Sequence, residues 1–150
     1  MESEEKLWAK TLLTAYTYLD EAAFEADRRL MDEALYSWRS PRSAEGVCRQ
    51  LMQIVAVKEG YINAKVITKQ CLDDIADKYR RALVCRYIKK YTYTVIAQVA
   101  KVSERSVYNH MLRAIDAFAL ALKKRGYDAK RMKEMFDGNS FIMGVYRRIK

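Results

Sequence analysis

Apolar residues recur at intervals of three and four along most of the chain, the period of a helix that buries one face. In the first part they are Leu12, Tyr16, Leu19, Ala23, Ala26 and Leu30. This alternation predicts one long helix from Glu4 to about Trp38 with a heptad seam. Such a seam needs a partner helix, which either the same chain or a second copy of the protein could supply.

A second periodic stretch extends from Glu45 to Tyr79. Its apolar members are Val47, Leu51, Ile54, Val55, Ile62, Val66, Leu72 and Ile75. Ser40 and Pro41 precede it, and they can end the first helix and start the next, with serine as the cap and proline in the first turn. Gly60 is a candidate break that would divide the stretch into two helices.

The stretch from Ala82 to Lys123 has the pattern of a helix-turn-helix with supporting helices. Ser103 is a good N-cap for a long helix, and Thr94 can cap the short helix before it. Residues 94–100 make about two turns, and residues 101 and 102 form the connector. This size and order are typical of a DNA-reading helix pair.

The helix after Ser103 is amphipathic at about 100° per residue. Its apolar face holds Val107, Met111, Ala114, Phe118, Ala121 and Leu122. The opposite face near the N-terminal end has the chemistry of base recognition, because Arg can bond guanine, Asn adenine and Glu cytosine. We therefore predict contacts with bases from Glu104, Arg105, Asn109 and Arg113. The helix is expected to end at Gly126.

Contacts with phosphates are expected around this helix and along its neighbours. Basic and apolar residues interleave from Lys78 to Tyr91, where the first helix of such a domain crosses the DNA backbone. The predicted phosphate contacts are Arg86, Lys89, Lys90, Tyr93, Lys101, Ser103, Ser106 and Tyr108.

The run from Leu72 to Leu122 resembles region four of bacterial sigma factors. The matching positions are Leu83, Arg86, Tyr87 and Ile88, then Tyr93, Ile96, Ala97, Val102 and Ser103, and then Val107, Arg113 and Ala114. An acidic helical part before such a domain is also similar to the layout of phage late-transcription regulators of the RinA and ArpU type. The resemblance implies a domain that reads promoter DNA. Lys101 departs from the usual glycine at the turn, so it must adopt a costly left-handed conformation or a differently shaped turn.

The net charge of +9 is unevenly distributed. Residues 1–34 hold nine acidic and four basic side chains, which leaves +14 for the remainder. A basic body favours a polyanionic partner, here double-stranded DNA, and the acidic arm favours a protein or intramolecular partner. No apolar run is long enough for a membrane span and the start is acidic, so we expect a cytoplasmic protein that does not bind membranes.

No constellation for catalysis or metal binding is found. Cys48, Cys71 and Cys85 lack metal-ligand spacing, and His110 is the only histidine. The carboxylates of Asp73, Asp74 and Asp77 are close in sequence without a further ligand. We therefore expect neither an enzyme, nor a metal site, nor a cofactor.

The expected fold is all-α, with long N-terminal helices packed with a C-terminal trihelical helix-turn-helix domain. Residues 1–70 would form a dimerisation or polymerase-contact region, residues 71–126 the DNA-binding domain, and residues 127–150 a helical tail that docks on the body or mediates assembly. The leading interpretation is a sequence-specific transcription regulator of the phage or prophage type, with RNA polymerase and a second copy as further partners. A genuine small sigma factor and a packaging subunit similar to a small terminase remain alternatives.

Overall fold

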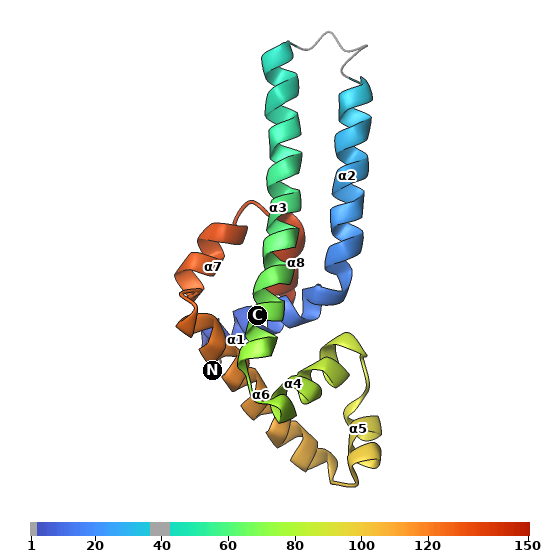
Figure 1. The fold of residues 1–150 in the computed structure, drawn as a ribbon, viewed down its shortest axis with the longest axis vertical. Helices are drawn as coiled ribbons and strands as arrows, with labels where there is room; N and C mark the ends of the chain where they lie inside the picture. Colours follow the sequence, from blue (N-terminus) through green and yellow to red (C-terminus); the bar gives the residue numbers. More distant parts are fainter. Residues whose placement is uncertain (1–2, 37–42) are drawn as a thin grey trace.

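The computed structural model describes residues 3–36 and 43–150, in which every regular element is a helix (Figure 1). The predicted all-α fold is confirmed. The predicted break at Ser40 and Pro41 lies outside the described residues, as does Trp38. The elements are α1 (Glu4–Ala15), the 3-10 turn η1 (Tyr16–Tyr18), α2 (Leu19–Tyr36), α3 (Ala44–Asp74), α4 (Asp77–Leu83), the π-helical η2 (Val84–Ile88), α5 (Tyr93–Ala100), α6 (Glu104–Lys124), α7 (Ala129–Phe136) and α8 (Ser140–Ile149). None of these described helices is long and apolar enough to cross a bilayer.

The prediction of one helix from Glu4 to Trp38 is wrong. The chain turns at η1, so that α1 lies across the base of α2 rather than in line with it (Figure 1). The reason is that the two halves of the heptad seam have different partners. Leu12 of α1 and Leu19 at the start of α2 are buried in the main core with Trp8, whereas Ala26, further along α2, is buried outside that core on the helix that packs against α3.

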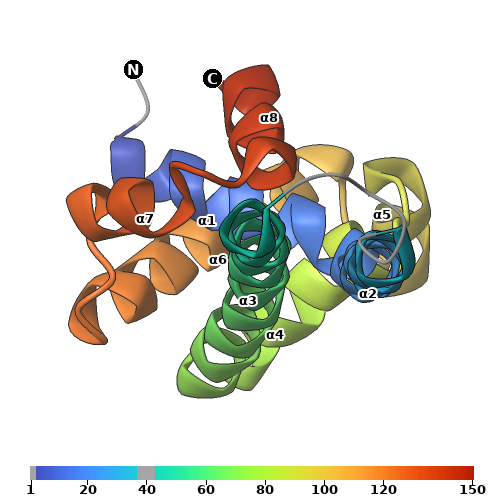
Figure 2. The same cartoon turned by 90° about the horizontal axis from the view of Figure 1, so that it is seen from above.

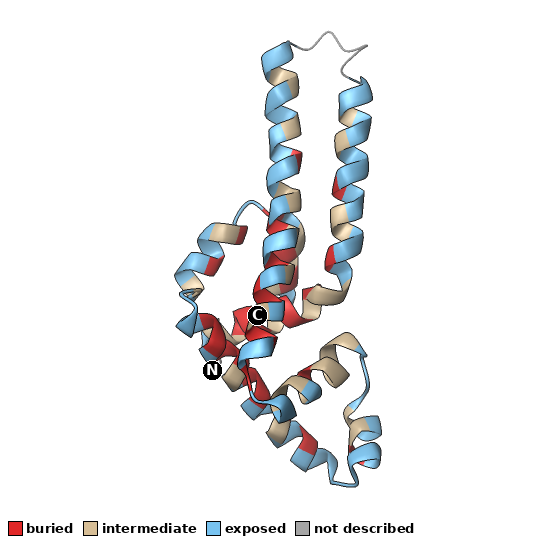
Figure 3. Cartoon of the chain, in the orientation of Figure 1, coloured by how far each residue is buried: buried red, intermediate tan, exposed pale blue. Residues whose placement is uncertain are grey.

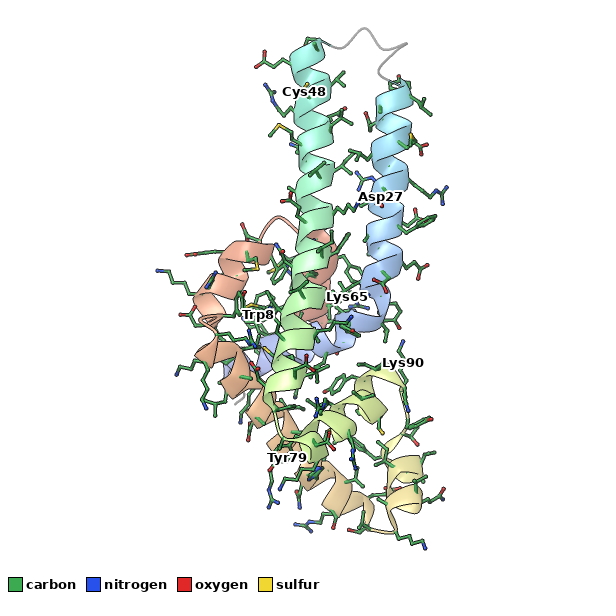
Figure 4. All side chains as sticks on the ribbon, viewed as in Figure 1. Trp8, Asp27, Cys48, Lys65, Tyr79 and Lys90 are labelled. Carbon is green, nitrogen blue, oxygen red and sulfur yellow. The ribbon has the colours of Figure 1, made fainter. Side chains whose placement is uncertain are left out.

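Helices α2 and α3 form a long antiparallel hairpin that projects from the rest of the molecule (Figure 1). Its seam is intramolecular. Two ion pairs cross it on the solvent side, from Lys58 Nζ to Asp27 Oδ1 at 2.6 Å and from Lys65 Nζ to Asp20 Oδ1 at 2.5 Å (Figure 4). The acidic face of α2 is thus partly neutralised by basic residues of α3.

Helix α3 is continuous through Gly60, so this glycine does not break it. Gly60 instead permits a close approach, because a Cβ atom there would lie 2.8 Å from Asn139 Nδ2. The amide of Asn139 donates to Val57 O at 3.2 Å, and its oxygen accepts from Ile142 N at 3.0 Å. Asn139 therefore joins the hairpin to the start of α8.

The main core lies below the hairpin and draws on helices from both ends of the chain (Figure 3). The ring of Trp8 stacks on Tyr146 with centroids 4.5 Å apart and lies 6.0 Å from Phe136. Phe118 and Leu122 of α6 are buried in the same cluster. The C-terminal tail consequently docks on the body, with α7 and α8 packed against α1 (Figure 2).

Candidate nucleic-acid interface

Helices α4, α5 and α6 form the predicted trihelical unit, with both shorter helices packed against α6. Its floor consists of buried Leu83, Ala97, Val107 and Met111. The ring of His110 packs 5.2 Å from that of Tyr79, and its Nε2 lies 3.3 Å from Lys78 O. His110 therefore joins α6 to α4.

The short helix α5 is capped by Thr92 and not by Thr94 as the sequence suggested. Thr92 Oγ1 accepts from Val95 N at 3.2 Å. The Thr94 hydroxyl instead donates to Glu104 Oε1 at 2.6 Å. Glu104, a predicted base contact, thus ties the start of α6 to the start of α5.

The connector adopts the first of the two conformations expected for it. Lys101 is left-handed with φ 59° and ψ 44°, and Val102 N bonds back to Ala97 O at 3.1 Å. This bond closes the last turn of α5 and directs the chain into α6. A β-carbon in this conformation costs about 1–2 kcal/mol, so the turn carries strain that a glycine would relieve.

Helix α6 begins and ends where the sequence predicted. Ser103 Oγ accepts from Ser106 N at 3.1 Å, which is the expected N-cap. At the other end Gly126 has φ 86°, with Gly126 N bonded to Lys123 O and Tyr127 N to Leu122 O. The predicted apolar face is buried at Val107, Met111, Ala114, Phe118, Ala121 and Leu122.

The polar face of α6 is open to solvent at its N-terminal end. Arg105, Asn109 and Arg113 are all exposed, on the side opposite the buried row. Asn109 and Arg113 also border a groove whose floor contains apolar residues from α4, α5 and the turn, among them Ala82, Ile96 and Val102. A guanidinium, an amide and a second guanidinium are therefore presented together on one helical surface.

Several predicted phosphate contacts are held by other parts of the protein. Arg86 donates to Tyr91 O at 3.2 Å and lies 4.3 Å above the ring of Tyr93, which meets Tyr108 edge-on at 6.2 Å. Arg86 and Tyr93 thus brace the unit, while Tyr108 remains exposed. Arg86 lies in η2, where Lys89 N bonds Val84 O across a widened turn. The sequence carried no signal for this π-helical turn.

Lys90 links the unit to the base of the hairpin. Its Nζ donates to the Tyr18 hydroxyl at 2.7 Å and lies 4.2 Å from that ring's centroid (Figure 4). The remaining predicted contacts, Lys89, Lys101, Ser103 and Ser106, are exposed around the start of α6 and the end of η2.

The charge of the protein is concentrated in this unit. Residues 77–125 hold twelve basic and three acidic side chains, a net charge of +9 that equals that of the whole chain. Long-range attraction of a polyanion is therefore directed at this end of the molecule.

The carboxylates just before and at the start of the unit serve as structural partners. Arg125 forms a two-pronged pair with Asp74, including Nη2 to Oδ1 at 2.8 Å, and these bonds hold the pKa of Asp74 below its usual range. Asp77 pairs with Arg80 at 2.8 Å and with Arg81 at 2.6 Å. Within the described residues, no group of His, Cys, Asp and Glu is arranged to hold a metal ion.

A comparison with known families matches most of this unit. Residues 66–117 match the family described as sigma-70, region 4. This part of the chain is similar to sigma-70 region 4 domains. The matched stretch covers about a third of the chain and runs from the end of α3 into the middle of α6. No curated protein and no solved structure matches the chain.

The similarity to sigma-70 region 4 indicates a DNA-binding, transcription-related function for residues 66–117. The match ends within α6, so it covers the surface that holds Arg105, Asn109 and Arg113 but not α1, α7 and α8, which carry Trp8 and its aromatic partners.

Proposed function

We propose that the protein is a sequence-specific transcription regulator of the phage or prophage type that reads duplex DNA with the first half of α6. The observation that carries the proposal is the exposed row of Arg105, Asn109 and Arg113 at the capped end of α6 within a region 4 domain. A helix N-terminus with such side chains fits the major groove, where Arg pairs with guanine and Asn with adenine.

These three residues would contact the bases, whereas Glu104 would have a structural role. Because Glu104 accepts a hydrogen bond from the Thr94 hydroxyl, it links the start of α6 to the start of α5. Phosphate contacts fall to the exposed Lys89, Lys101, Ser106 and Tyr108, which border the same end of α6. Arg86, Lys90 and Tyr93 support this surface from within the fold.

The direct test is selection from a randomised duplex library, followed by affinity for the selected site against salt. A defined motif is expected, with affinity that falls steeply as salt rises because bound phosphates release counterions. Selection of no motif would contradict the proposal.

Two variants separate base reading from phosphate binding. Arg105→Ala should weaken the selected site by about 1–3 kcal/mol and relax preference at one base pair. Lys89→Ala should weaken all duplexes alike and reduce the salt slope by about one unit. Lys89 is the better phosphate control than Arg86, because truncation of Arg86 would also remove its stacking on Tyr93. Equal behaviour of the two variants on every duplex would contradict the assignment of Arg105.

A genuine sigma factor is the second candidate, and a transcription assay separates it from the first. A sigma factor must also hold unstacked bases of the opened promoter, for which exposed aromatic side chains are suited. Tyr18, Phe24 and Tyr36 are exposed at and beyond the base of the hairpin, but α2 is acidic, which opposes single-strand binding. Initiation by RNA polymerase core enzyme with this protein alone would favour the sigma factor, whereas a requirement for a resident sigma factor would favour the regulator.

A further inference from the structure

The α2–α3 hairpin exposes a row of apolar side chains along α3. Met52 is 71% exposed, and Val55, Ile62 and Val66 are exposed as well. With exposed Cys48 and Glu59 they follow a strict spacing of four and three, from residue 48 to residue 66. This is the pattern of a helix that packs lengthwise against another helix.

No described part of the chain covers this row. Gly60, Ala64, Ile67 and Cys71, which are buried, lie on the side of α3 that faces the body. At about 100° per residue, the exposed row lies roughly opposite to them. Lys58 and Lys65 mark the side that faces α2, about a quarter turn away from the row.

Helix α2 carries a second apolar row, formed by Phe24, Met31 and Leu35, with Met31 62% exposed. Their spacing of seven and four places them on one face. Leu19 and Ala26, which are buried on α2, point in a different direction. The hairpin therefore has an apolar row on each helix in addition to the seam that joins the two helices.

The ion pairs across the seam fix how the two rows are aligned along the hairpin. Asp27 is level with Lys58, and Asp20 with Lys65. On this alignment Phe24 is level with Ile62, Met31 with Val55, and Leu35 with Met52, each within two residues. Arg28, inside the α2 row, is level with Glu59, inside the α3 row, to the same precision.

The charges of the two helices are complementary. Residues 19–36 carry six acidic and two basic side chains, whereas residues 44–70 carry four basic and two acidic ones. Arg28 bonds Glu25 at 3.1 Å within its own helix, through an exposed pair that contributes little to stability and can exchange partners. The apolar row of α2 thus matches the apolar row of α3 in position, and Arg28 lies level with the oppositely charged Glu59. The two helices also carry net charges of opposite sign.

We propose that the occupant of this face is a second copy of the protein. In a two-fold pair with the hairpins side by side and pointing the same way, α2 of each copy packs on α3 of the other. The contacts then join Phe24 with Ile62, Met31 with Val55 and Arg28 with Glu59, each formed twice. The product is a four-helix bundle with both region 4 domains at one end, an arrangement that suits a DNA site with two half-sites.

Sedimentation of the full chain over a range of concentrations tests the association. The wild type is expected to sediment as a dimer, and Val55→Asp should raise the dimer dissociation constant at least about tenfold, because it buries a carboxylate in the interface. Ala56→Asp is the matched control, since residue 56 is the exposed neighbour about 100° off the row. A monomeric wild type, or equal effects of both substitutions, would overturn the proposal.

A charge exchange tests the pairing itself. Arg28→Glu and Glu59→Arg should each weaken the homodimer, because like charges then face one another twice. An equimolar mixture of the two variants should recover the dimer. In the mixed pair the glutamate introduced at position 28 of one copy meets the arginine introduced at position 59 of the other, and the unchanged Arg28 and Glu59 meet across the second contact. A change that acted only within one chain would not respond to mixing. Failure of the mixture to associate more strongly than either variant alone would overturn the α2-to-α3 pairing.

This inference and the proposed reading of DNA can fail separately. Val55→Asp leaves Arg105, Asn109 and Arg113 untouched, so the monomeric variant should still select the same half-site from a duplex library. A variant that loses association but keeps the motif supports both ideas. Loss of the motif in the wild type would reject the reading of DNA without affecting the sedimentation result.

Discussion

Around Trp8, side chains from several helices are buried together, whereas the outer part of the α2–α3 hairpin buries little besides Ala26 and Ile54. Trp8 meets aromatic partners on α7 and α8, and the same cluster includes Phe118 of α6. Across the single seam of the hairpin, Lys58 pairs with Asp27 and Lys65 with Asp20. The difference indicates that the body provides most of the stability, whereas the hairpin exposes most of its side chains to solvent.

The largest effect should follow from a cavity in the body. Trp8→Ala is expected to lower the free energy of unfolding by about 3–5 kcal/mol, because the ring is buried against Phe136 and Tyr146. Urea denaturation followed by far-UV circular dichroism measures the change. Trp8→Phe serves as the control and should cost less, since it keeps an aromatic ring in place. A loss below about 1 kcal/mol for the alanine variant would show that the body is not the main source of stability.

A smaller effect is expected inside the hairpin. Ile54→Ala should cost about 2 kcal/mol, at the low end for a buried aliphatic side chain, because a two-helix seam can collapse around the gap. The neighbouring Gln53→Ala is exposed and should change stability by less than about 0.5 kcal/mol. The same urea titration applies to both. An Ile54 cost as large as that of Trp8 would remove the contrast between the two regions.

The contact of Asn139 between the hairpin and α8 should contribute still less to the free energy of unfolding. Asn139→Ala is expected to cost about 1–2 kcal/mol, because it removes both the cap of α8 and the bond to Val57 O. Asn139→Ser separates these effects, since a serine can still cap α8 but cannot reach α3. If this contact matters, amide hydrogen exchange near Val57 should rise in both variants. Protection unchanged in the serine variant would show that the cap alone is important.

The smallest effect should depend on pH. Arg125 donates to the carboxylate of Asp74, which lowers the pKa of Asp74 below its ordinary value of 3.8. A lowered pKa in the folded state stabilises the protein above the unfolded pKa, and this contribution is lost as the pH falls through the folded pKa. Unfolding titrations from about pH 6 to about pH 2 should therefore show a loss that Asp74→Asn lacks. Identical pH profiles for the two proteins would mean that the pair does not link α3 to α6 in solution.

The helix-turn-helix was predictable because its signals are local. Ser103 caps α6, Gly126 ends it, and the spacing of Val107 and Met111 identifies its buried face. The cap of α5 was misplaced because Thr92 and Thr94 are both good caps, and the choice depends on the path by which the chain enters the helix. The exposure of the α6 polar face could be predicted for the same local reason.

Other features depend on partners that are distant in sequence. The turn at η1 could not be predicted from the heptad pattern, because a continuous pattern does not reveal that its two halves pack on different helices. The expected break at Gly60 was wrong, because the glycine makes room for the side chain of Asn139, which is far along the chain. Likewise, Lys90 has a side chain suited to a phosphate contact, but it bonds to Tyr18, which is 72 positions away.

Helix α6 is unbroken from Glu104 to Lys124. Its first half holds Arg105 and Asn109, and its second half is clamped in the body by Phe118 and Leu122. At 1.5 Å per residue it is a rod about 31 Å long. A duplex bound at one end of this helix would have a fixed orientation relative to the hairpin. A partner bound to the hairpin would therefore lie at a defined position along the DNA.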